Sequence, residues 1–291
     1  MNLHKMNRFP RRQLLKLLAI IMLSDGNIHL RKGKLVGLRL ITTYNSKDAH
    51  FLLKWLCKKL FRKEPRFYNY KDKFNRKFNK SELYSIIAVK KLLELSPTYK
   101  TTPSNDAMYL KLPQPTLSFI LVENRAFIWA ALGLYFDFDG SISPYFKLRR
   151  KKDIKNGKIY QYYQVQFECE ISIAETNYSL IKDFINIFSM LGIKARIKKD
   201  KRNWNGMEGI SISELKSVKK FIIMRNALID MPISKSKRFY NIDKQSVCKA
   251  TLNLLNYKWF KASHYFNSYQ EASRFRNKSA KEFLKYIKAT N

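Results

Sequence analysis

Two acidic residues in the chain each follow an apolar run and precede a glycine. Asp25-Gly26 ends the run "LAIIMLSDG", and Asp139-Gly140 ends the run "LGLYFDFDG". An acid at the C-terminal end of a helix is electrostatically unfavourable, because that end carries partial negative charge, and two such acids side by side are worse. Lys or Arg could compensate for this charge, but paired carboxylates between basic strands suit a divalent metal best. A metal held between an attacking water and a leaving oxygen cleaves phosphodiesters, so the pattern favours a metal-dependent nuclease.

The segments that follow each acid repeat the same order of elements. This repeat favours a functional role for the two acids. A lone acid before a glycine is more often a solvated loop residue. Alternating polar and apolar residues predict strands, and apolar residues at helical spacing predict amphipathic helices. In the first half the expected order is strands in 27–44, a helix in 45–61, short strands at 65–70 and 76–79, and a helix in 81–95 capped by Ser81. In the second half it is strands at 141–150 and 162–173, a helix in 175–193 ending near Gly192, strands at 194–200 and 206–213 around a turn at 201–206, and a helix in 214–229.

Two equivalent helices from two equivalent units are expected to pair about a pseudo-twofold axis, which brings both acids to the centre. The predicted fold class is α+β, with two pseudo-symmetric αββαββα halves whose antiparallel sheets form a saddle. A stretch rich in Pro, Ser and Thr at 96–115 indicates the linker. The predicted division is 1–96 for the first half, 97–123 for the linker, 124–231 for the second half and 232–291 for a basic C-terminal extension. Three roles stay open for this helical, aromatic-bearing extension: packing on the second half, touching nucleic acid, or partial disorder.

The charge balance is the strongest global feature of the chain. Fifty-seven Lys and Arg against 22 Asp and Glu give a net charge of +35. Such an excess favours a polyanionic partner, because each cation near a phosphate displaces a condensed counterion. A ribosomal-type RNA binder and an anionic membrane surface are the alternatives. With 45% hydrophobic residues, the chain can form a real core.

The cysteines and the N-terminus argue against a disulfide-rich, zinc-binding, secreted or membrane-spanning protein. Cys57, Cys169 and Cys248 show neither a disulfide framework nor zinc-ligand spacing, so they are expected to be small buried residues in a reducing compartment. The first apolar run is broken by Lys16 and lacks a cleavage site, which argues against a signal peptide, and no run is long enough to span a membrane. We therefore expect an intracellular location, in an organelle or in a prokaryotic cytoplasm.

The two runs, Leu18–Gly26 and Leu132–Gly140, resemble the LAGLIDADG motif, and the chain resembles the single-chain, two-motif LAGLIDADG homing endonucleases over roughly residues 12 to 230. The order of elements after each motif matches the family's αββαββα half. The resemblance implies that the motif helices form the interface, that the sheets form two saddles over DNA, and that the acid before the final glycine binds divalent metal. It places the metal site at Asp25, Gly26, Asp139 and Gly140. The expected metal is Mg²⁺ or another divalent ion such as Mn²⁺, while Ca²⁺ would bind without supporting cleavage.

The motifs also depart from the family pattern. Ile20 and Leu134 occupy the third motif position, where the family often has a small residue for close helix approach. Phe138 replaces another usually small residue. Asp137 is a second acid close by, but Leu23 stands at its equivalent position in the first motif, and this asymmetry favours Asp139 as the metal acid.

The open faces of the two predicted sheets should carry the DNA contacts. Arg, Gln, Asn and Ser suit base edges in the major groove, and Lys suits phosphates. The alternative for any one of these residues is a solvated sheet face. Lys198 is also a candidate for stabilising the transferred phosphate, while Glu168 and Glu170 are expected to pair with neighbouring Arg or Lys. The predicted DNA contacts are Asn27, His29, Arg31, Arg39, Thr43, Ser141, Ser143, Tyr145, Lys147, Arg149, Gln164, Gln166, Arg196 and Lys198.

Three functions fit these features. The leading one is a site-specific endonuclease that cleaves both strands of a long DNA target, is encoded within an intron, and is monomeric because both motifs lie in one chain. The second is an intron maturase that uses the same scaffold to bind intron RNA and assist splicing. The third is a DNA-binding protein that does not cleave, against which the presence of both acids argues.

Overall fold

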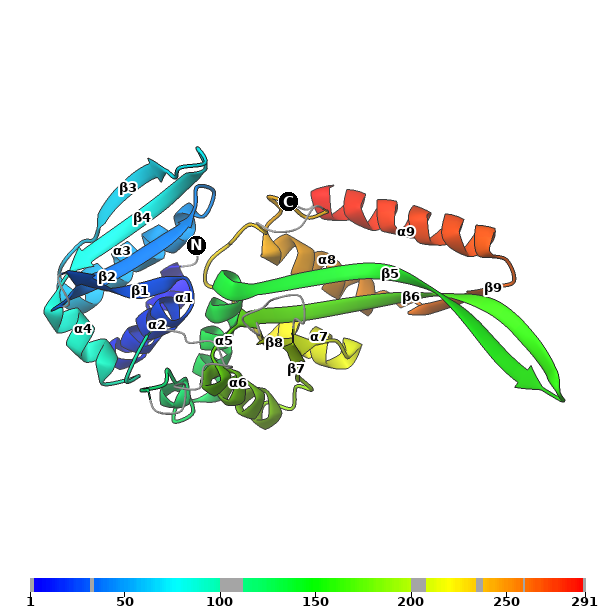
Figure 1. Ribbon diagram of the computed structural model, residues 1–291, viewed down its shortest axis with the longest axis horizontal. Helices are drawn as coiled ribbons and strands as arrows, with labels where there is room; N and C mark the ends of the chain where they lie inside the picture. Colours follow the sequence, from blue (N-terminus) through cyan, green and yellow to red (C-terminus); the bar gives the residue numbers. More distant parts are fainter. Residues whose placement is uncertain are drawn as a thin grey trace.

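The chain forms two halves with the same order of elements, joined through a pair of central helices (Figure 1). The computed structural model describes residues 3–31, 34–99, 112–199, 208–233, 238–258 and 260–289. The first half comprises α1 (Leu3–Met6), α2 (Arg11–Leu23), β1 (Gly26–Arg31), β2 (Lys34–Thr43), α3 (Lys47–Phe61), β3 (Arg66–Lys71), β4 (Lys77–Tyr84) and α4 (Ile86–Leu93). After the short η2 (Ser118–Ile120), the second half comprises α5 (Arg125–Asp139), β5 (Gly140–Lys155), β6 (Lys158–Glu175), α6 (Tyr178–Met190), β7 (Arg196–Lys199), β8 (Glu208–Ile212) and α7 (Leu215–Met224).

Both halves contain an antiparallel sheet with the same strand order. The order is β1-β2-β4-β3 in the first half and β5-β6-β8-β7 in the second. One face of each sheet is apolar and packs on helices; on β6 this face carries Val165, Phe167, Cys169, Ile171 and Ile173, all buried as predicted. In the second sheet the other face is polar. The repeated topology confirms the α+β fold with two pseudo-symmetric αββαββα halves.

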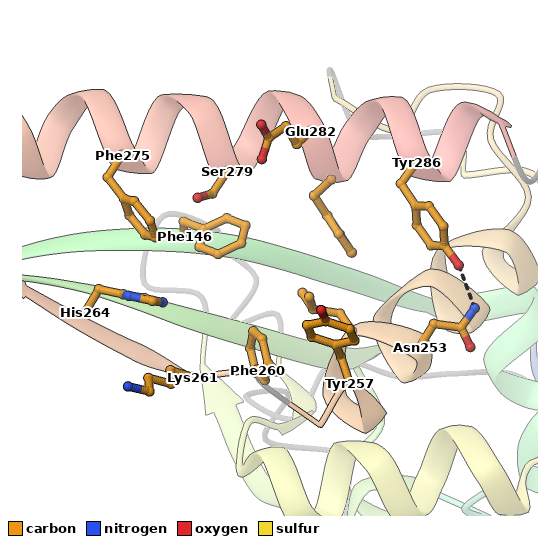
Figure 2. Close-up of a pocket in the computed structure, with 12 residues that line it drawn as sticks. Phe146, Asn253, Tyr257, Phe260, Lys261, His264, Phe275, Ser279, Glu282 and Tyr286 are labelled. Atoms are coloured by element: carbon orange, nitrogen blue, oxygen red, sulfur yellow. Dashed lines mark hydrogen bonds between the residues drawn. The ribbon is translucent and has the colours of Figure 1, made fainter.

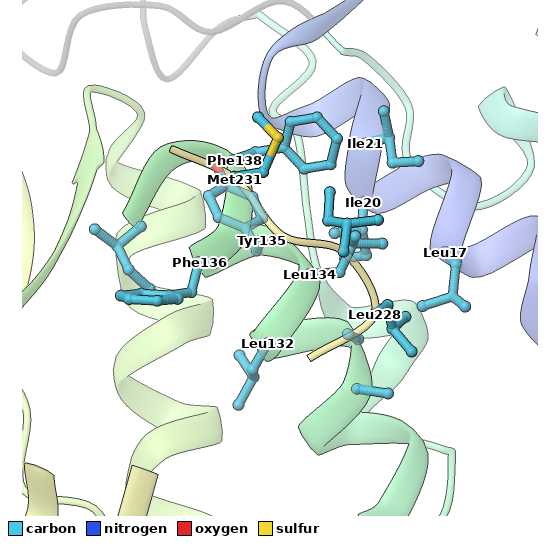
Figure 3. Packing of buried hydrophobic residues seen from close by; sticks show 14 of the residues in the cluster. Leu17, Ile20, Ile21, Leu132, Leu134, Tyr135, Phe136, Phe138, Leu228 and Met231 are labelled. Atoms are coloured by element: carbon cyan, nitrogen blue, oxygen red, sulfur yellow. The ribbon is translucent and has the colours of Figure 1, made fainter. Parts of the chain in front are cut away.

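The helices α2 and α5 pack against one another at the centre of the molecule (Figures 1 and 3). Ile20 and Leu134, the large residues at the third motif position, are 1% and 0% exposed and belong to the same buried cluster. Gly133 does not face α2: a Cβ added there would meet Arg225 and Asn226 at 3.5–3.6 Å. The interface is therefore built from aliphatic side chains, and the small residue one position earlier serves a different contact.

A buried ion pair joins the start of α2 to the segment before α5. The Lys16 ammonium, which interrupts the first apolar run, lies 2.5 Å from a carboxylate oxygen of Glu123 and donates to the Phe119 carbonyl. Gln13 donates to the same carboxylate at 2.7 Å. These contacts satisfy a lysine that the apolar surroundings would otherwise leave as an uncompensated charge.

The last helix of the first half begins later than predicted. Residues 81–84 continue β4, and Ser85 rather than Ser81 caps α4 by accepting from the Ala88 amide at 3.3 Å. The Ser81 hydroxyl instead bonds Nδ1 of His50 at 2.7 Å under the sheet. Pairing of β4 with both β2 and β3 outweighs the helical preference of this stretch.

The second half departs from expectation at two places. The β5–β6 hairpin runs to Lys155 and Lys158, well beyond the predicted 141–150 and 162–173, and turns at Asn156-Gly157, both with positive φ. The helix α7 stops at Met224 instead of residue 229, and the chain continues as an extended segment whose Leu228 and Met231 cover α5 (Figure 3). The predicted helix end at Gly192 is confirmed by its φ of +68°. The predicted turn at 201–206 lies outside the described residues.

The described part of the C-terminal extension packs on the second half. It contains α8 (Lys244–Asn256), β9 (Ser263–Phe266) and α9 (Tyr269–Ala289), with β9 paired antiparallel to β6. The prediction of a helical tail was therefore incomplete, since it missed α8 and β9. Of the three open roles, packing on the second half is observed.

All three cysteines are buried and free, as expected. In the described part of the chain, no helix has both the length and the apolar character needed to cross a membrane.

Truncation of the motif-helix interface should destabilise the protein strongly. Ile20→Ala removes a fully buried side chain between α2 and α5, and we expect the free energy of unfolding to fall by about 2–5 kcal/mol. Ile154→Ala, at the exposed end of the β5–β6 hairpin, is the control and should change it little. Urea denaturation measures both; equal midpoints for the two variants would contradict the packing described.

Stability should also fall as the pH drops from about 6.5 towards 4, in part because of His50. Burial lowers the pKa of His50 from 6.5 to about 4, and the ring bridges the hydroxyls of Thr42 and Ser81. Between these values the unfolded chain binds more protons than the folded one, so protonation favours unfolding. The difference in unfolding free energy between the wild type and His50→Gln should therefore grow with pH across this window and level off above it. The exposed His4→Gln variant is the control, and a pH-independent difference for His50→Gln would refute the assignment.

Candidate metal centre and nucleic-acid interface

Asp25 and Asp139 line the same hollow between the two halves. The hollow has a volume of about 420 Å³ and opens where α2 and α5 end and β1 and β5 begin. The structure thus brings together the two acids that the repeat singled out. Hydroxyl groups from both halves share the hollow with them: Thr42, Thr43, Ser46, Ser141, Ser143 and Ser172.

The position after each acid must be glycine, because there is no room for a side chain. A Cβ at Gly26 would lie 2.7 Å from the Ile21 carbonyl oxygen, and a Cβ at Gly140 would lie 2.5 Å from that of Phe136. Gly140 has φ −88°, so the glycine is not a left-handed helix stop of the kind expected from an Asp-Gly helix end. In both halves the first strand leaves so close to the last helical turn that no side chain fits at this position.

The backbone carbonyls at the ends of α2 and α5 accept hydrogen bonds from different donors. At the end of α2, the Ser24 hydroxyl bonds the carbonyls of Ile20 and Ile21, both at 3.1 Å. At the end of α5, a lysine from the C-terminal extension does this: Nζ of Lys244 donates to the carbonyls of residues 136, 137 and 138 at 3.1, 2.7 and 3.1 Å.

Lys244 also lines the hollow with the two acids, although its side chain is almost fully buried. Burial lowers the pKa of its ammonium to about 8, and the carboxylates of Asp137, Asp25 and Asp139 oppose this shift. The Lys244 ammonium therefore offsets the partial negative charge at the C-terminal end of α5 and the charge of the nearby acid.

Asp137, the second acid of the second motif, is placed away from the hollow. Its side chain is 0% exposed, and a carboxylate oxygen lies 3.3 Å from the guanidinium of the buried Arg225. Burial raises the pKa of Asp137 to about 6, against the opposing effect of Arg225 and Lys244. Arg225 also donates to Gln245 at 2.7 Å. Asp137 therefore belongs to a structural ion pair, which leaves Asp139 as the acid of this motif that lines the hollow.

A buried tyrosine within the electrostatic influence of the two acids links the halves. The Tyr135 hydroxyl donates to Glu175 at 2.6 Å and lies 3.4 Å from the Leu23 carbonyl at the end of α2. Burial raises the pKa of Tyr135 well above its usual value, and the charges of Glu175, Asp139 and Asp25 act in the same direction. Tyr135 therefore stays protonated and acts as a hydrogen-bond donor to Glu175.

The donor set fits a divalent cation that keeps part of its hydration shell. Among the residues that the structure describes, no group of three or more His, Cys, Asp and Glu could hold a metal. The two carboxylates at Asp25 and Asp139, with the adjacent backbone at Gly26 and Gly140, would therefore be completed by water or phosphate oxygens. Mg²⁺ prefers this kind of site.

The open face of the second sheet carries the predicted contacts of that half in alternating register. Directly paired residues of β5 and β6 project to the same side, as the Ser141–Ser172 bond at 2.8 Å shows. Glu168 accepts from Tyr145 and pairs with Arg149, and Glu170 lies 2.7 Å from Lys198. The expected pairing of these two glutamates with basic neighbours is thereby confirmed. The positions on this face are Ser141, Ser143, Tyr145, Lys147, Arg149, Gln164, Gln166, Arg196 and Lys198.

Lys198, predicted to assist catalysis, is not among the described residues that line the hollow. Its ammonium is bound to Glu170 on the open face. The lysine at the hollow is Lys244, which sequence patterns could not identify because it lies outside both repeats. The sequence indicated only that some cation was needed.

The open face of the first sheet is more aromatic than expected. Arg39 pairs with Glu82 at 2.8 Å and contacts Nδ1 of His29 at 2.6 Å. Asn27 lies opposite Arg39 on β1, and Thr43 lines the hollow. The side chain of Arg31 lies outside the described residues. Sequence reasoning missed the aromatic residues that share this face by register: Tyr68, Tyr70, Phe78 and Tyr84.

Comparison with known proteins gives similarities in structure but not in sequence. No protein-family model matches the sequence, and no curated protein matches it. Among solved structures, variants of the homing endonuclease I-DmoI match with a TM-score of 0.46 and 14% identity, covering 74% of this chain and 90% of that chain. The homing endonuclease I-WcaI bound to its DNA recognition sequence matches with a TM-score of 0.42 and 15% identity, over 78% and 85% of the two chains. The N-terminal LAGLIDADG domain of WhiA matches with a TM-score of 0.38 and 14% identity, over 75% and 84%.

Removal of the Lys244 ammonium should destabilise the second half. Lys244→Met keeps the aliphatic stem but leaves three buried carbonyls at the end of α5 without their donor. We expect the free energy of unfolding to fall by about 1–3 kcal/mol, because hydrogen bonds to charged groups are lost while the buried ammonium no longer has to be desolvated. Lys249→Met, on the exposed side of the same helix, is the matched control. A melting temperature as high for Lys244→Met as for Lys249→Met would show that the cap contributes nothing.

Proposed function

We propose that the chain is a site-specific endonuclease of the LAGLIDADG type that cleaves both strands of duplex DNA with a divalent metal. One observation carries the proposal. Asp25 and Asp139, from equivalent positions in two equivalent halves, line one hollow where the two motif helices end and the first strands of both sheets begin. A twofold arrangement of acids is suited to a duplex, whose two strands are themselves related by local twofold symmetry.

The bound metal would polarise the phosphate and activate a water molecule at neutral pH. Asp25 and Asp139 would hold it, and the hydroxyl-rich wall of the hollow would face the sugar-phosphate backbone. Lys244 balances the charge at the end of α5 from within the protein. Its ammonium is held by three backbone carbonyls of α5, so we assign Lys244 a positioning role at the site.

The two sheets would form the DNA-binding surface. Two-stranded ribbons enter the major groove, where Arg and Gln read base edges and Lys contacts phosphates. The β5–β6 hairpin provides such a ribbon with Lys147, Arg149, Gln164 and Gln166 on its open face. Because both halves lie in one chain, a monomer would bind the whole target.

Binding of intron RNA is the second candidate, and one observation favours it. The open face of the first sheet combines exposed aromatic rings with cations, for example Lys80 over the ring of Tyr68 at 5.3 Å. Aromatic faces stack unpaired bases irrespective of sequence, which suits RNA with single-stranded parts. A maturase would use this face without cleaving DNA.

Substitution of either acid should abolish cleavage and leave DNA binding in place. On a library of long duplexes with Mg²⁺, the wild type is expected to cut both strands, and Asp25→Asn and Asp139→Asn should each lose at least about a hundredfold in rate. Binding without metal should persist, because the substitution removes negative charge beside the DNA. Glu271→Gln on the exposed start of α9 removes one acid elsewhere and is the control.

Two outcomes would sink the endonuclease assignment. Cleavage that is unchanged in both Asn variants would place the chemistry elsewhere in the chain. Tight binding to intron RNA with no cleavage of any duplex would favour the maturase.

A further inference from the structure

The C-terminal extension adds a strand to the polar sheet of the second half. The strand β9 pairs with β6 from Tyr163↔Phe266 to Gln166↔Ser263, on the edge of β6 that β8 occupies farther along. The amide of Phe167 continues this ladder to the carbonyl of Ala262 at 2.8 Å. The extension thereby widens the outer part of the sheet beyond the αββαββα plan.

The two faces of β9 differ in chemistry. His264 and Phe266 turn towards α9, where both rings lie against Phe275 at centroid distances of 4.5 and 5.2 Å (Figure 2 shows His264 and Phe275). Ser263 and Tyr265 project to the opposite face. The Ser263 hydroxyl accepts from Gln164 at 3.1 Å, and the Tyr265 ring lies 5.7 Å from that of Tyr162.

These contacts place Ser263 and Tyr265 on the open face that carries the predicted DNA contacts. Tyr265 lies opposite Gln164, which itself lies opposite Arg149 on β5. Tyr265 is 63% exposed, so its side chain is accessible from solvent on this face. Across the ribbon, β5 places Lys147, Arg149 and Lys151 on the same face.

We propose that β9 is part of the nucleic-acid surface, and that Ser263 and Tyr265 contact the backbone of duplex DNA away from the cleavage centre. This inference rests on the proposed function. Arg149 is nine residues beyond Gly140, which corresponds to about 30 Å along the strand and to about nine base pairs at 3.4 Å each. In the first half, the pairing of β1 with β2 ends at Arg31, about 17 Å along the strand from Gly26. The second half therefore reaches farther along the duplex than the first.

The test compares charge changes at two equally exposed tyrosines. Tyr265→Glu places a negative charge on the open face, and Tyr257→Glu makes the same change on the groove between α8 and α9, where Tyr257 is 62% exposed (Figure 2). Affinity of the full chain is measured for a random-sequence 40-base-pair duplex (about four helical turns) without metal. We expect about tenfold weaker binding for Tyr265→Glu, little change for Tyr257→Glu, and wild-type or tighter binding for Tyr265→Lys.

Equal affinities for Tyr265→Glu, Tyr265→Lys and Tyr257→Glu, with equal melting temperatures, would overturn the inference and leave β9 as an edge cover. Binding without cleavage under any metal would overturn the proposed endonuclease but not this surface, whereas absence of any duplex binding would overturn both. On a cleaved target, hydroxyl-radical footprints should reach about nine base pairs from the cut on one side, and Tyr265→Glu should lose that protection.

Discussion

The packing of α2 against α5 is the constraint on which the rest of the structure depends. It sets the two halves side by side and makes both helices end at one place. Gly26 and Gly140 then allow β1 and β5 to leave immediately past the last helical turn, where a Cβ would clash with a backbone carbonyl. The same contact thus fixes the positions of both acids and the starts of both sheets. Ile20 and Leu134 show that this packing is compatible with large aliphatic residues at the third motif position.

The packing creates an electrostatic conflict that the two halves resolve differently. Carbonyls at the end of α2 are bonded by the Ser24 hydroxyl within the motif, while those of α5 are bonded by the Lys244 ammonium from outside the repeat. The extension therefore has two structural roles. Lys244 of α8 bonds the end of α5, and β9 adds a strand beside β6. Because each half of a two-motif chain has its own sequence, the two halves can differ in their helix ends, sheet edges and hairpin lengths.

The sequence predicted the features that follow from local periodicity and from the repeat, namely most helices and strands and the relation between the two halves. The order of helices and strands along each half, and the position of Asp25 and Asp139 in one hollow, followed from two copies of one plan. Features set by tertiary contacts were missed. Ser81 turned out to bond His50 under the sheet, and Lys244 lies outside both repeats. The long β5–β6 hairpin carried a readable signal, Asn156-Gly157, which favours a tight hairpin turn.

In the proposed mechanism, Asp25 and Asp139 together hold one metal between the two halves. Cleavage of the protein backbone by Fe²⁺ and ascorbate tests it most directly, because hydroxyl radicals cut the chain beside the bound ion without any need for activity. Cuts near both residue 25 and residue 139, suppressed by excess Mg²⁺ and absent in the Asp25→Asn, Asp139→Asn double variant, are the predicted result. Cuts confined to one of the two sites, or unchanged in the double variant, would contradict a shared metal centre.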